Sequence, residues 1–309
     1  MRATFQRLMY RAARRVLGGT ADYMRHSLAG APLAYRPGHF YSPITAPAEV
    51  LRDWRDPDAQ DTPATLADIA LTVADSQRVW DGWADLLVAP SPALHPALRR
   101  RYHADNRHYA TGDALVYSCM LRQLRPARLM EIGSGFSSAL ALDVIEAEGG
   151  TWPSLTFVEP YPALLESLLL PGDRERLRII DQGVQQVPLE EFDVLESGDI
   201  LFIDSTHVVK TGSDVVHELT RILPRLKPGV IVHFHDIFWP FEYPRDWAVT
   251  RNFSWNEAYA LRAFLAFNSA WRILFFADHL RRFGDASVQA MLERTDGTLG
   301  AGLWLVRVA

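Results

Sequence analysis

The stretch Leu129-Met-Glu-Ile-Gly-Ser-Gly-Phe-Ser-Ser138 decides the fold of this chain. An apolar strand is expected over residues 128–133, a loop follows with Gly133 and Gly135, and a helix is expected over residues 137–148. In such a strand–loop–helix unit, backbone N–H groups and the positive end of the helix bind part of a nucleotide. The stretch therefore predicts an α/β fold that binds a nucleotide-type ligand.

Glu131 distinguishes between the ligands that such a loop accepts. A dinucleotide would place its pyrophosphate beside this carboxylate, which would repel it. S-adenosylmethionine carries an ammonium and a sulfonium cation instead, and a carboxylate attracts both. The loop Gly133-Ser-Gly-Phe-Ser-Ser138 also lacks the third Gly or Ala of the NAD fingerprint. Methyl transfer is therefore the leading hypothesis.

Size and composition are those of an ordinary globular protein. The 309 residues leave room for one large or two modest domains, and 48% are hydrophobic and 22% charged. A formal net charge of −5 favours no nucleic-acid partner. The single cysteine, Cys119, excludes an internal disulfide, favours a cytoplasmic setting and is expected to be a buried structural thiol. No apolar stretch approaches the roughly 20 residues of a membrane span, so no transmembrane segment is expected.

Strands and helices alternate from Pro126 onward. Strands are expected at residues 128–133, 155–160, 177–181, 200–204, 230–235, 272–276 and 302–308. Helices are expected at residues 65–87, 113–124, 137–148, 162–170, 188–196, 213–226 and 255–268. This alternation predicts a doubly wound, mostly parallel sheet of seven strands with helices on both faces.

The chain before this alternation is expected to be a helical and loop N-terminal extension over residues 1–112, followed by a ligand-binding domain over residues 113–309. Within residues 2–16, arginines alternate with apolar residues and predict a basic amphipathic helix. One interpretation is a surface helix that packs one face on the protein. The alternative is a helix that docks on a membrane surface or a partner.

Polar residues follow the second and third strands of the predicted sheet. Glu159 lies 24 residues after Gly135, a spacing at which a carboxylate accepts both hydroxyls of a ribose. The alternative for Glu159 is a surface acid at a strand end. Asp181, Gln182 and Val184 come at the end of the third strand, where they are candidates to flank an adenine.

Four motifs carry a resemblance to a known family. They are Glu131-Ile-Gly-Ser-Gly-Phe-Ser-Ser138, Phe157-Val-Glu-Pro160, Phe202-Ile-Asp-Ser-Thr-His207 and Gly229-Val-Ile-Val-His-Phe-His-Asp236. The chain resembles S-adenosylmethionine-dependent methyltransferases of the Rossmann-like class over about residues 100–309. It is most similar to the small-molecule O-methyltransferases that include the catechol and macrolide-sugar enzymes. The resemblance implies that the last strand inserts antiparallel into the sheet.

The resemblance also implies roles in cofactor binding. Glu131 would hold the methionine ammonium, and Glu159 would bind the ribose. Gly133, Ser134 and Gly135 would let the cofactor approach the backbone closely, and Ser137 and Ser138 would donate hydrogen bonds to the carboxylate of its methionine part. Asp204 is also implied in cofactor binding.

A hydroxyl acceptor must lose a proton, and His207 is the leading candidate to accept it. Catechol-type enzymes carry a metal-ligand Asp at the position of Asp204 and a lysine base three positions later. Here the third position is His207, whose side chain is suited to accept a proton near neutral pH. Its structural alternative is a residue that caps the loop, and Lys210 is a reserve candidate for the base.

The motif His233-Phe-His-Asp236 follows at the end of the fifth strand. By resemblance, Asp204, His235 and Asp236 fall where catechol-type enzymes bind a divalent cation such as Mg²⁺, which would lower the pKa of the acceptor. The sequence departs from that pattern because His235 offers nitrogen, whereas Mg²⁺ prefers oxygen. The alternative is a metal-free site in which Asp236 and a histidine orient the acceptor, with Asp204, His207 and Asp236 as the catalytic set.

Aromatic residues are dense after Asp236. They are Phe238, Trp239, Phe241, Tyr243, Trp247, Phe253, Trp255 and Tyr259, and they form either a cover that excludes water from the acceptor or part of the core. Residues 102–109 are a polar and aromatic run that lines the site or forms an exposed loop.

The leading hypothesis is transfer of a methyl group from S-adenosylmethionine to a hydroxyl of a small metabolite. A nucleic-acid methyltransferase is disfavoured because the catalytic half has no basic stripe. The alternatives are an oxygenase-associated enzyme of the same fold that does not methylate and a non-catalytic nucleotide-binding scaffold. Whether the chain forms a homo-oligomer is left open by the sequence.

Overall fold

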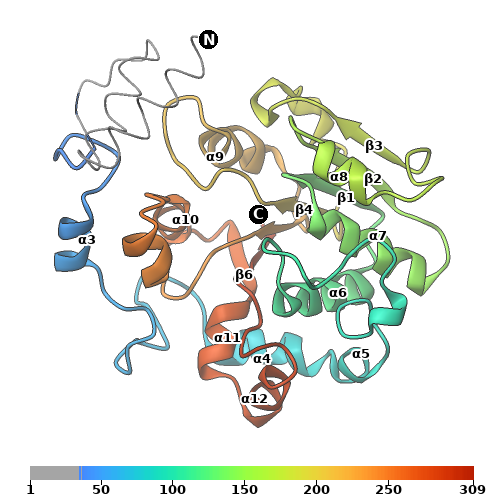
Figure 1. Cartoon of the computed structure of the whole chain (residues 1–309), viewed down its shortest axis with the longest axis horizontal. Helices are drawn as coiled ribbons and strands as arrows, with labels where there is room; N and C mark the ends of the chain where they lie inside the picture. The colour runs from blue at the N-terminus through green and yellow to red at the C-terminus, as the bar shows by residue number, and fades with distance from the viewer. Residues whose placement is uncertain (1–34, 36) are drawn as a thin grey trace, which may run out of the picture. The chain divides into compact units, whose positions relative to one another are not determined.

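The structure is a computed structural model that describes Tyr35 and residues 37–309 (Figure 1). The helix predicted for residues 2–16 lies outside the described residues. The chain divides into two compact units. The smaller unit contains the residues up to Asp56 together with Pro244–Ser254, and the larger unit contains Pro57–Tyr243 and Trp255–Ala309. The domain boundary between residues 112 and 113 stays a prediction.

A seven-stranded sheet forms the centre of the larger unit, in the order β3-β2-β1-β4-β5-β7-β6. The two pairs made by β7 are antiparallel and the other pairs are parallel. The strands are β1 (Arg128–Ile132), β2 (Ser154–Val158), β3 (Leu177–Ile180), β4 (Ile200–Ile203), β5 (Ile231–Phe234), β6 (Trp271–Phe276) and β7 (Leu303–Arg307). The predicted α/β fold, the seven strands and the antiparallel insertion of the last strand are confirmed.

Helices cover the sheet. They are α4 (Val73–Asp81), α5 (Ala84–Val88), α6 (Thr111–Leu124), α7 (Phe136–Glu148), α8 (Ala163–Leu168), α9 (Asp214–His217), α10 (Glu257–Leu265), α11 (Ala277–Phe283) and α12 (Ala286–Leu292). Short helical turns extend α9 through Arg225, so the helix predicted over residues 213–226 forms with a changed hydrogen-bonding pattern. Figure 1 shows α6 and α7 side by side, in contact with each other.

The helix predicted over residues 188–196 is wrong. Within this segment the chain forms a 3₁₀ turn at Leu189–Glu191, which follows another at Val184–Gln186. Apolar residues three positions apart, such as Phe192 and Leu195, also suit 3₁₀ turns, so their spacing does not by itself select an α-helix. Phe192 and Leu195 are buried without a continuous helix.

The core lies on both faces of the sheet, because helices cover both faces. Its fully buried side chains include Phe157 and Phe202 on strands and Leu140 on α7. Cys119 on α6 is 1% exposed, and burial raises the pKa of its thiol to about 12. It is thus the buried thiol that the sequence predicted.

Within the described part of the chain, no helix has both the length and the apolar character needed to cross a membrane.

In the smaller unit, α3 (Pro47–Asp53) is accompanied by a helical turn at Asp246–Thr250. The hydroxyl of Thr45 donates to the side-chain oxygen of Asn252 at 3.0 Å, and the Asn252 amide donates back to the Thr45 carbonyl at 3.0 Å. These bonds connect the two chain segments of this unit.

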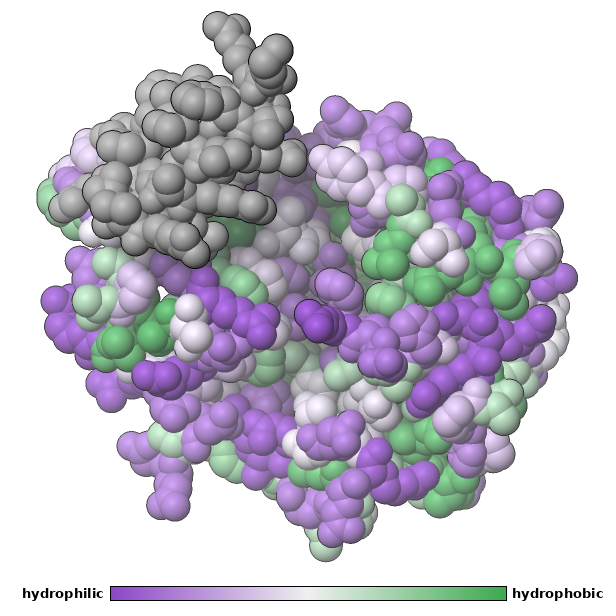
Figure 2. Space-filling model, in the orientation of Figure 1, coloured by the Kyte–Doolittle hydropathy of each residue, from purple (hydrophilic) through white to green (hydrophobic). Residues whose placement is uncertain are grey.

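On the face shown in Figure 2, hydrophobic residues of the described chain form patches interrupted by hydrophilic ones.

The direction of the strand order reverses between β1 and β4. From β1 the chain moves outward through β2 to β3, then returns to β4 on the other side of β1 and continues to β5. In open α/β sheets, ligands bind at the carboxyl ends of the strands beside such a reversal. A ligand site is therefore expected at the ends of β1, β4 and β5.

Candidate active site

The loop after β1 is in contact with the end of β4. Gly133 has a φ of +81°, and a Cβ at this position would lie 1.8 Å from the backbone oxygen of Asp204. The N–H of Asp204 donates to the carbonyl of Ile132 at 2.8 Å. A glycine is therefore required here, because a side chain would separate the loop from Asp204.

Glu131 lies inside this junction and is fully buried. The hydroxyl of Ser137 donates to its Oε1 atom, while its Oε2 atom has no hydrogen-bond partner. Burial raises the pKa of Glu131 to about 8, although the hydrogen bonds from Ser137 and Ser138 lower it. A buried carboxylate oxygen without a partner destabilises the fold unless a cation pairs with it or a donor forms a hydrogen bond to it.

Glu159 is tied to the same loop. Its carboxylate accepts the backbone N–H of Ser134 at 3.0 Å and that of Tyr161 at 2.8 Å. The hydroxyl of Ser138 accepts the N–H of Gly135 at 3.1 Å. The structure thus gathers around one loop the acidic and glycine residues that the sequence placed in cofactor binding.

The candidates for adenine contact lie one strand farther out. Val158 of β2 pairs with Ile180 of β3, and the N–H of Glu159 donates to the Ile180 carbonyl at 3.0 Å. The next residues after Ile180 are therefore on the same edge as Glu159. Val184 is buried there, whereas Asp181 and Gln182 are exposed. Their contacts with a ligand stay a prediction.

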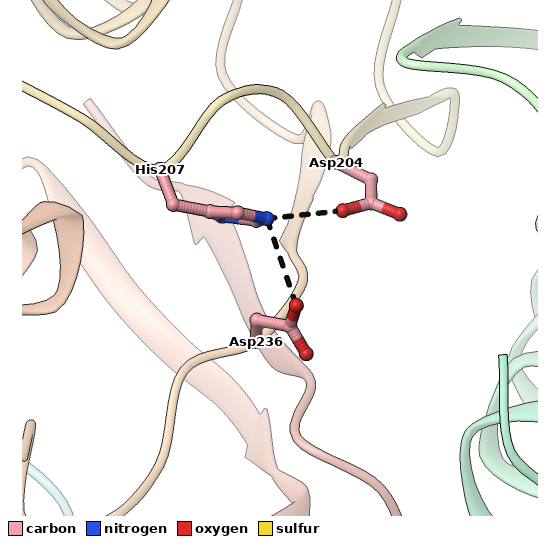
Figure 3. Close-up of side chains that lie close together, drawn as sticks. All are labelled: Asp204, His207 and Asp236. Atoms are coloured by element: carbon pink, nitrogen blue, oxygen red, sulfur yellow. Dashed lines mark ion pairs between the residues drawn. The ribbon is translucent and has the colours of Figure 1, made fainter. Parts of the chain in front are cut away.

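Asp204, His207 and Asp236 meet at the ends of β4 and β5 (Figure 3). The two strands are neighbours, so Asp204 after one and Asp236 after the other share an edge of the sheet. His207 has a φ of +60°, and its Nε2 atom lies 3.4 Å from Asp204 Oδ1 and 3.6 Å from Asp236 Oδ2. Figure 3 shows the imidazole directed between the two carboxylates.

Glu257, the first residue of α10, was missed by sequence reasoning. The Nδ1 atom of His207 lies 2.8 Å from Glu257 Oε2, and the two residues are 5% and 1% exposed. The ring of Trp255 lies 4.4 Å from the His207 ring, measured between centroids. Nothing in the sequence signals this pair, because Glu257 lies 50 residues after His207.

The charges of the cluster change the protonation of its members. Burial lowers the pKa of His207, but hydrogen bonds and negative charge from Asp204 and Glu257 outweigh burial and raise it to about 10. Burial raises the pKa of Asp204, but the neighbouring imidazoles of His235 and His207 lower it to about 2. His207 is therefore a strong base, and without a ligand it is largely protonated near neutral pH.

His233 on β5 and His235, the residue that follows β5, are both buried. His235 stacks on Tyr109, and its Nε2 atom lies 3.4 Å from Asp113 Oδ1. Neither ring nitrogen of His233 has a hydrogen-bond partner, and burial lowers its pKa well below the ordinary value. His233 is thus a neutral core residue, whereas His235 belongs to the acidic cluster.

Asp204, His235 and Asp236 offer imidazole nitrogen and carboxylate oxygen close together. His235 Nδ1 lies 3.2 Å from Asp236 Oδ1 and 3.7 Å from Asp204 Oδ1. Ligand atoms of Asp204, His207 and Asp236 also lie within 4.8 Å of one another. Both groupings place imidazole nitrogen beside the carboxylates, whereas Mg²⁺ prefers oxygen. This donor set does not fit Mg²⁺, so no step of the reaction is assigned to that ion.

The aromatic residues after Asp236 separate into different environments. Trp239, Phe241 and Tyr243 are at most 3% exposed and belong to the core. The indole of Trp239 donates to the Pro63 carbonyl at 2.7 Å. Trp255 is the member of this series that contacts His207.

The run at residues 102–109 is partly buried. Tyr102 and Tyr109 are each 2% exposed, and the hydroxyl of Tyr102 donates to the Tyr109 carbonyl at 3.1 Å. The rings of His103 and His108 lie 4.9 Å and 6.2 Å from the ring of Phe136, which begins α7 after the glycine loop. The run is therefore neither a simple exposed loop nor remote from the site.

Comparison with known proteins places this geometry in a family. Residues 130–237 match the family model described as a methyltransferase domain. A protein of Archaeoglobus fulgidus, described as uncharacterized, is 33% identical over 171 residues, which are 54% of this chain and 76% of that protein.

Two solved structures are similar to this chain. The O-methyltransferase TomG from Streptomyces achromogenes is 16% identical, with a TM-score of 0.46 over 78% of this chain and 100% of its own. The Podospora anserina methyltransferase PaMTH1 is 15% identical, with a TM-score of 0.46 over 79% and 100%. The family model and the seven-stranded sheet support the assignment: the chain belongs to the Rossmann-like methyltransferases, the S-adenosylmethionine-dependent class that its motifs resemble.

Proposed function

We propose that this methyltransferase transfers a methyl group from S-adenosylmethionine to a hydroxyl of a small metabolite. The observation that carries the proposal is the buried Oε2 atom of Glu131, which has no partner and lies beside a glycine loop. A cationic group of the ligand would pair with this carboxylate oxygen, whereas a pyrophosphate would be repelled by it. The methionine ammonium of S-adenosylmethionine supplies that cation.

The residues around Glu131 fit the rest of this cofactor. Gly133 and Gly135 leave the loop open to the ligand, and Ser134, Ser137 and Ser138 supply donors at the start of α7. The hydroxyl of Ser134 is buried without a partner, so it is available to a ligand. In this proposal Glu159 binds the ribose, Asp181, Gln182 and Val184 flank the adenine, and Asp204 adjoins the reacting end.

Chemistry takes place at the cluster of Asp204, His207 and Asp236. The acceptor oxygen forms a bond to the methyl carbon as the carbon–sulfur bond breaks, and sulfur keeps the electron pair. The acceptor proton passes to His207 Nε2, which has the two carboxylates beside it. Holding the acceptor and methyl group in line removes about 7–11 kcal/mol of the barrier. No step in this mechanism depends on a metal ion.

Calorimetry tests the cofactor assignment. We expect S-adenosylmethionine to bind and to bind more weakly when Glu131 is replaced by Gln, whereas NAD does not bind. Tighter binding of NAD than of S-adenosylmethionine would overturn the proposal.

Transfer of a labelled methyl group into a metabolite extract tests the activity and identifies the acceptor. We expect label in a small hydroxylated product. Binding of S-adenosylmethionine without transfer to any extract component would favour the two alternatives, a non-methylating enzyme of the same fold or a non-catalytic scaffold.

A further inference from the structure

We propose that Glu257 is a positioning residue for the proton transfer: it holds Nδ1–H of His207 and thereby directs Nε2 toward Asp204, Asp236 and the acceptor. This inference rests on the proposed function, because it assigns the group that orients its base. Glu257 acts through His207 and does not touch the reacting atoms.

The contact between Glu257 and His207 has the geometry of a charge-assisted hydrogen bond. Nδ1 and Oε2 are 2.8 Å apart, and the pair is almost completely shielded from water. Hydrogen bonds of this kind are about twice as strong as neutral ones, and a low local dielectric strengthens them further. Since a carboxylate only accepts, Nδ1 must carry a proton. The other ring nitrogen, Nε2, is then the atom that exchanges a proton with the acceptor.

The backbone fixes the same arrangement independently of the side chains. The carbonyl of His207 accepts the N–H groups of Asn256 at 3.1 Å and Glu257 at 3.2 Å. The Asn256 side chain accepts the N–H of Val209 at 2.6 Å and donates to the Val209 carbonyl at 3.3 Å. The turn that carries His207 is therefore attached to the start of α10, and the left-handed backbone conformation of His207 is held by these bonds.

A purely structural role does not account for the charges around Glu257. Its Oε1 atom is buried without a partner, and its negative charge adds to the burial that raises the pKa of Glu218, another fully buried carboxylate. Two buried acids near one imidazole destabilise the fold relative to apolar residues of similar size. Such arrangements are typical of functional sites, where a carboxylate orients a histidine and stabilises the imidazolium that forms.

The experiment compares Glu257→Gln and Glu257→Ala in the full-length protein, with Glu242→Gln as a matched control. Glu242 also accepts hydrogen bonds near α10, from Tyr259 and the Tyr243 N–H, but it does not contact His207. We expect Glu257→Ala to lower kcat about 100-fold or more, with the KM of the acceptor and the affinity for S-adenosylmethionine changed less than about threefold. Glu257→Gln keeps an acceptor for Nδ1–H and should recover part of the rate, while Glu242→Gln retains kcat.

A proton NMR measurement separates this proposal from the proposed function, because it requires no turnover. The wild-type protein should show a strongly deshielded Nδ1–H resonance that disappears in both His207→Gln and Glu257→Ala and persists in Glu242→Gln. Loss of the resonance in Glu257→Ala together with an inactive wild type would support the contact and refute the function. An unchanged kcat in a folded Glu257→Ala protein, or a resonance that survives this substitution, would overturn the role of Glu257.

Discussion

Gly133 and Asp204 are in direct contact across the junction of β1 and β4, and no side chain fits between them. The backbone oxygen of Asp204 would lie 1.8 Å from a Cβ on Gly133. The glycine loop, which we propose binds the cofactor, and the end of β4, which carries part of the proposed catalytic cluster, are thus in backbone contact.

Gly133→Ala should therefore impair both folding and cofactor binding. Gly172→Ala is the matched control, since Gly172 has a φ of +91° but no atom within 4 Å of its Cβ position. We expect the control to lower the free energy of unfolding by about 1–2 kcal/mol, the cost of a left-handed backbone. Gly133→Ala should lower it by clearly more and weaken S-adenosylmethionine binding, as measured by urea unfolding and calorimetry. Equal effects of the two substitutions would show that the contact with Asp204 is unimportant.

Glu131→Gln should weaken S-adenosylmethionine binding by about 10- to 100-fold, because it removes a charge-assisted contact of about 1.5–3 kcal/mol. The same substitution should change the pH dependence of stability. Since burial raises the folded-state pKa of Glu131 to about 8, its protonated form stabilises the ligand-free protein at low pH, and this contribution is lost as pH rises toward 8. Thermal unfolding of the ligand-free protein at pH 5 to 9 should show a smaller decline in the Gln variant. Identical stability profiles of the wild type and the Gln variant between pH 5 and 9 would contradict the raised pKa of Glu131.

His207→Gln should lower kcat about 100- to 10,000-fold while S-adenosylmethionine affinity is nearly retained. In the wild type, kcat/KM should increase with pH toward about 10, because His207 must lose its proton before it can accept another. The bound sulfonium disfavours the imidazolium, so kcat should reach its plateau at a lower pH than kcat/KM. Steady-state rates between pH 6 and 10.5 measure both profiles. A rate that falls as pH rises over this range would exclude His207 as the base.

Zn²⁺ should inhibit methyl transfer, and Mg²⁺ should have little effect. Zn²⁺ accepts imidazole and carboxylate donors together, so it competes with the proton for His207 Nε2 beside Asp204 and Asp236. Calorimetry and rate measurements with each ion provide the test, and Asp236→Asn should weaken Zn²⁺ binding. Activation by either ion would contradict the metal-free mechanism.

Arg101→Ala should be among the most destabilising substitutions outside the site. The buried Arg101 guanidinium donates to Asp143 at 2.9 Å and to Asp173 at 2.6 Å, and its loss leaves two buried carboxylates with backbone N–H donors and no cation from Arg101. We expect a loss of about 3–5 kcal/mol in the free energy of unfolding. Arg178→Ala, which breaks an exposed pair with Glu191, should cost less than about 1 kcal/mol. Similar losses for both variants in urea unfolding would refute this expectation.

The strands could be predicted from sequence because each is a short, largely apolar run, and β1 to β5 are each followed at once by a polar or glycine residue. Each ends within two residues of its predicted limit. The glycine loop and Glu131 could be found for the same reason, since they are consecutive in the chain. The segment at residues 188–196 failed because a few apolar residues at helical spacing do not distinguish a helix from consecutive 3₁₀ turns.

The sequence by itself determined the layers of the fold, the loop beside Glu131 and the placement of Asp204, His207 and Asp236 at strand ends, because these follow from local spacing and strand periodicity. Only the tertiary structure decided that Glu257 contacts His207 from the start of α10, and that Asp113 lies beside His235. Those partners are far apart in the chain, and their contacts depend on how the helices pack on the sheet. The raised pKa of His207 depends on these packed carboxylates, so it too is a property of the folded chain.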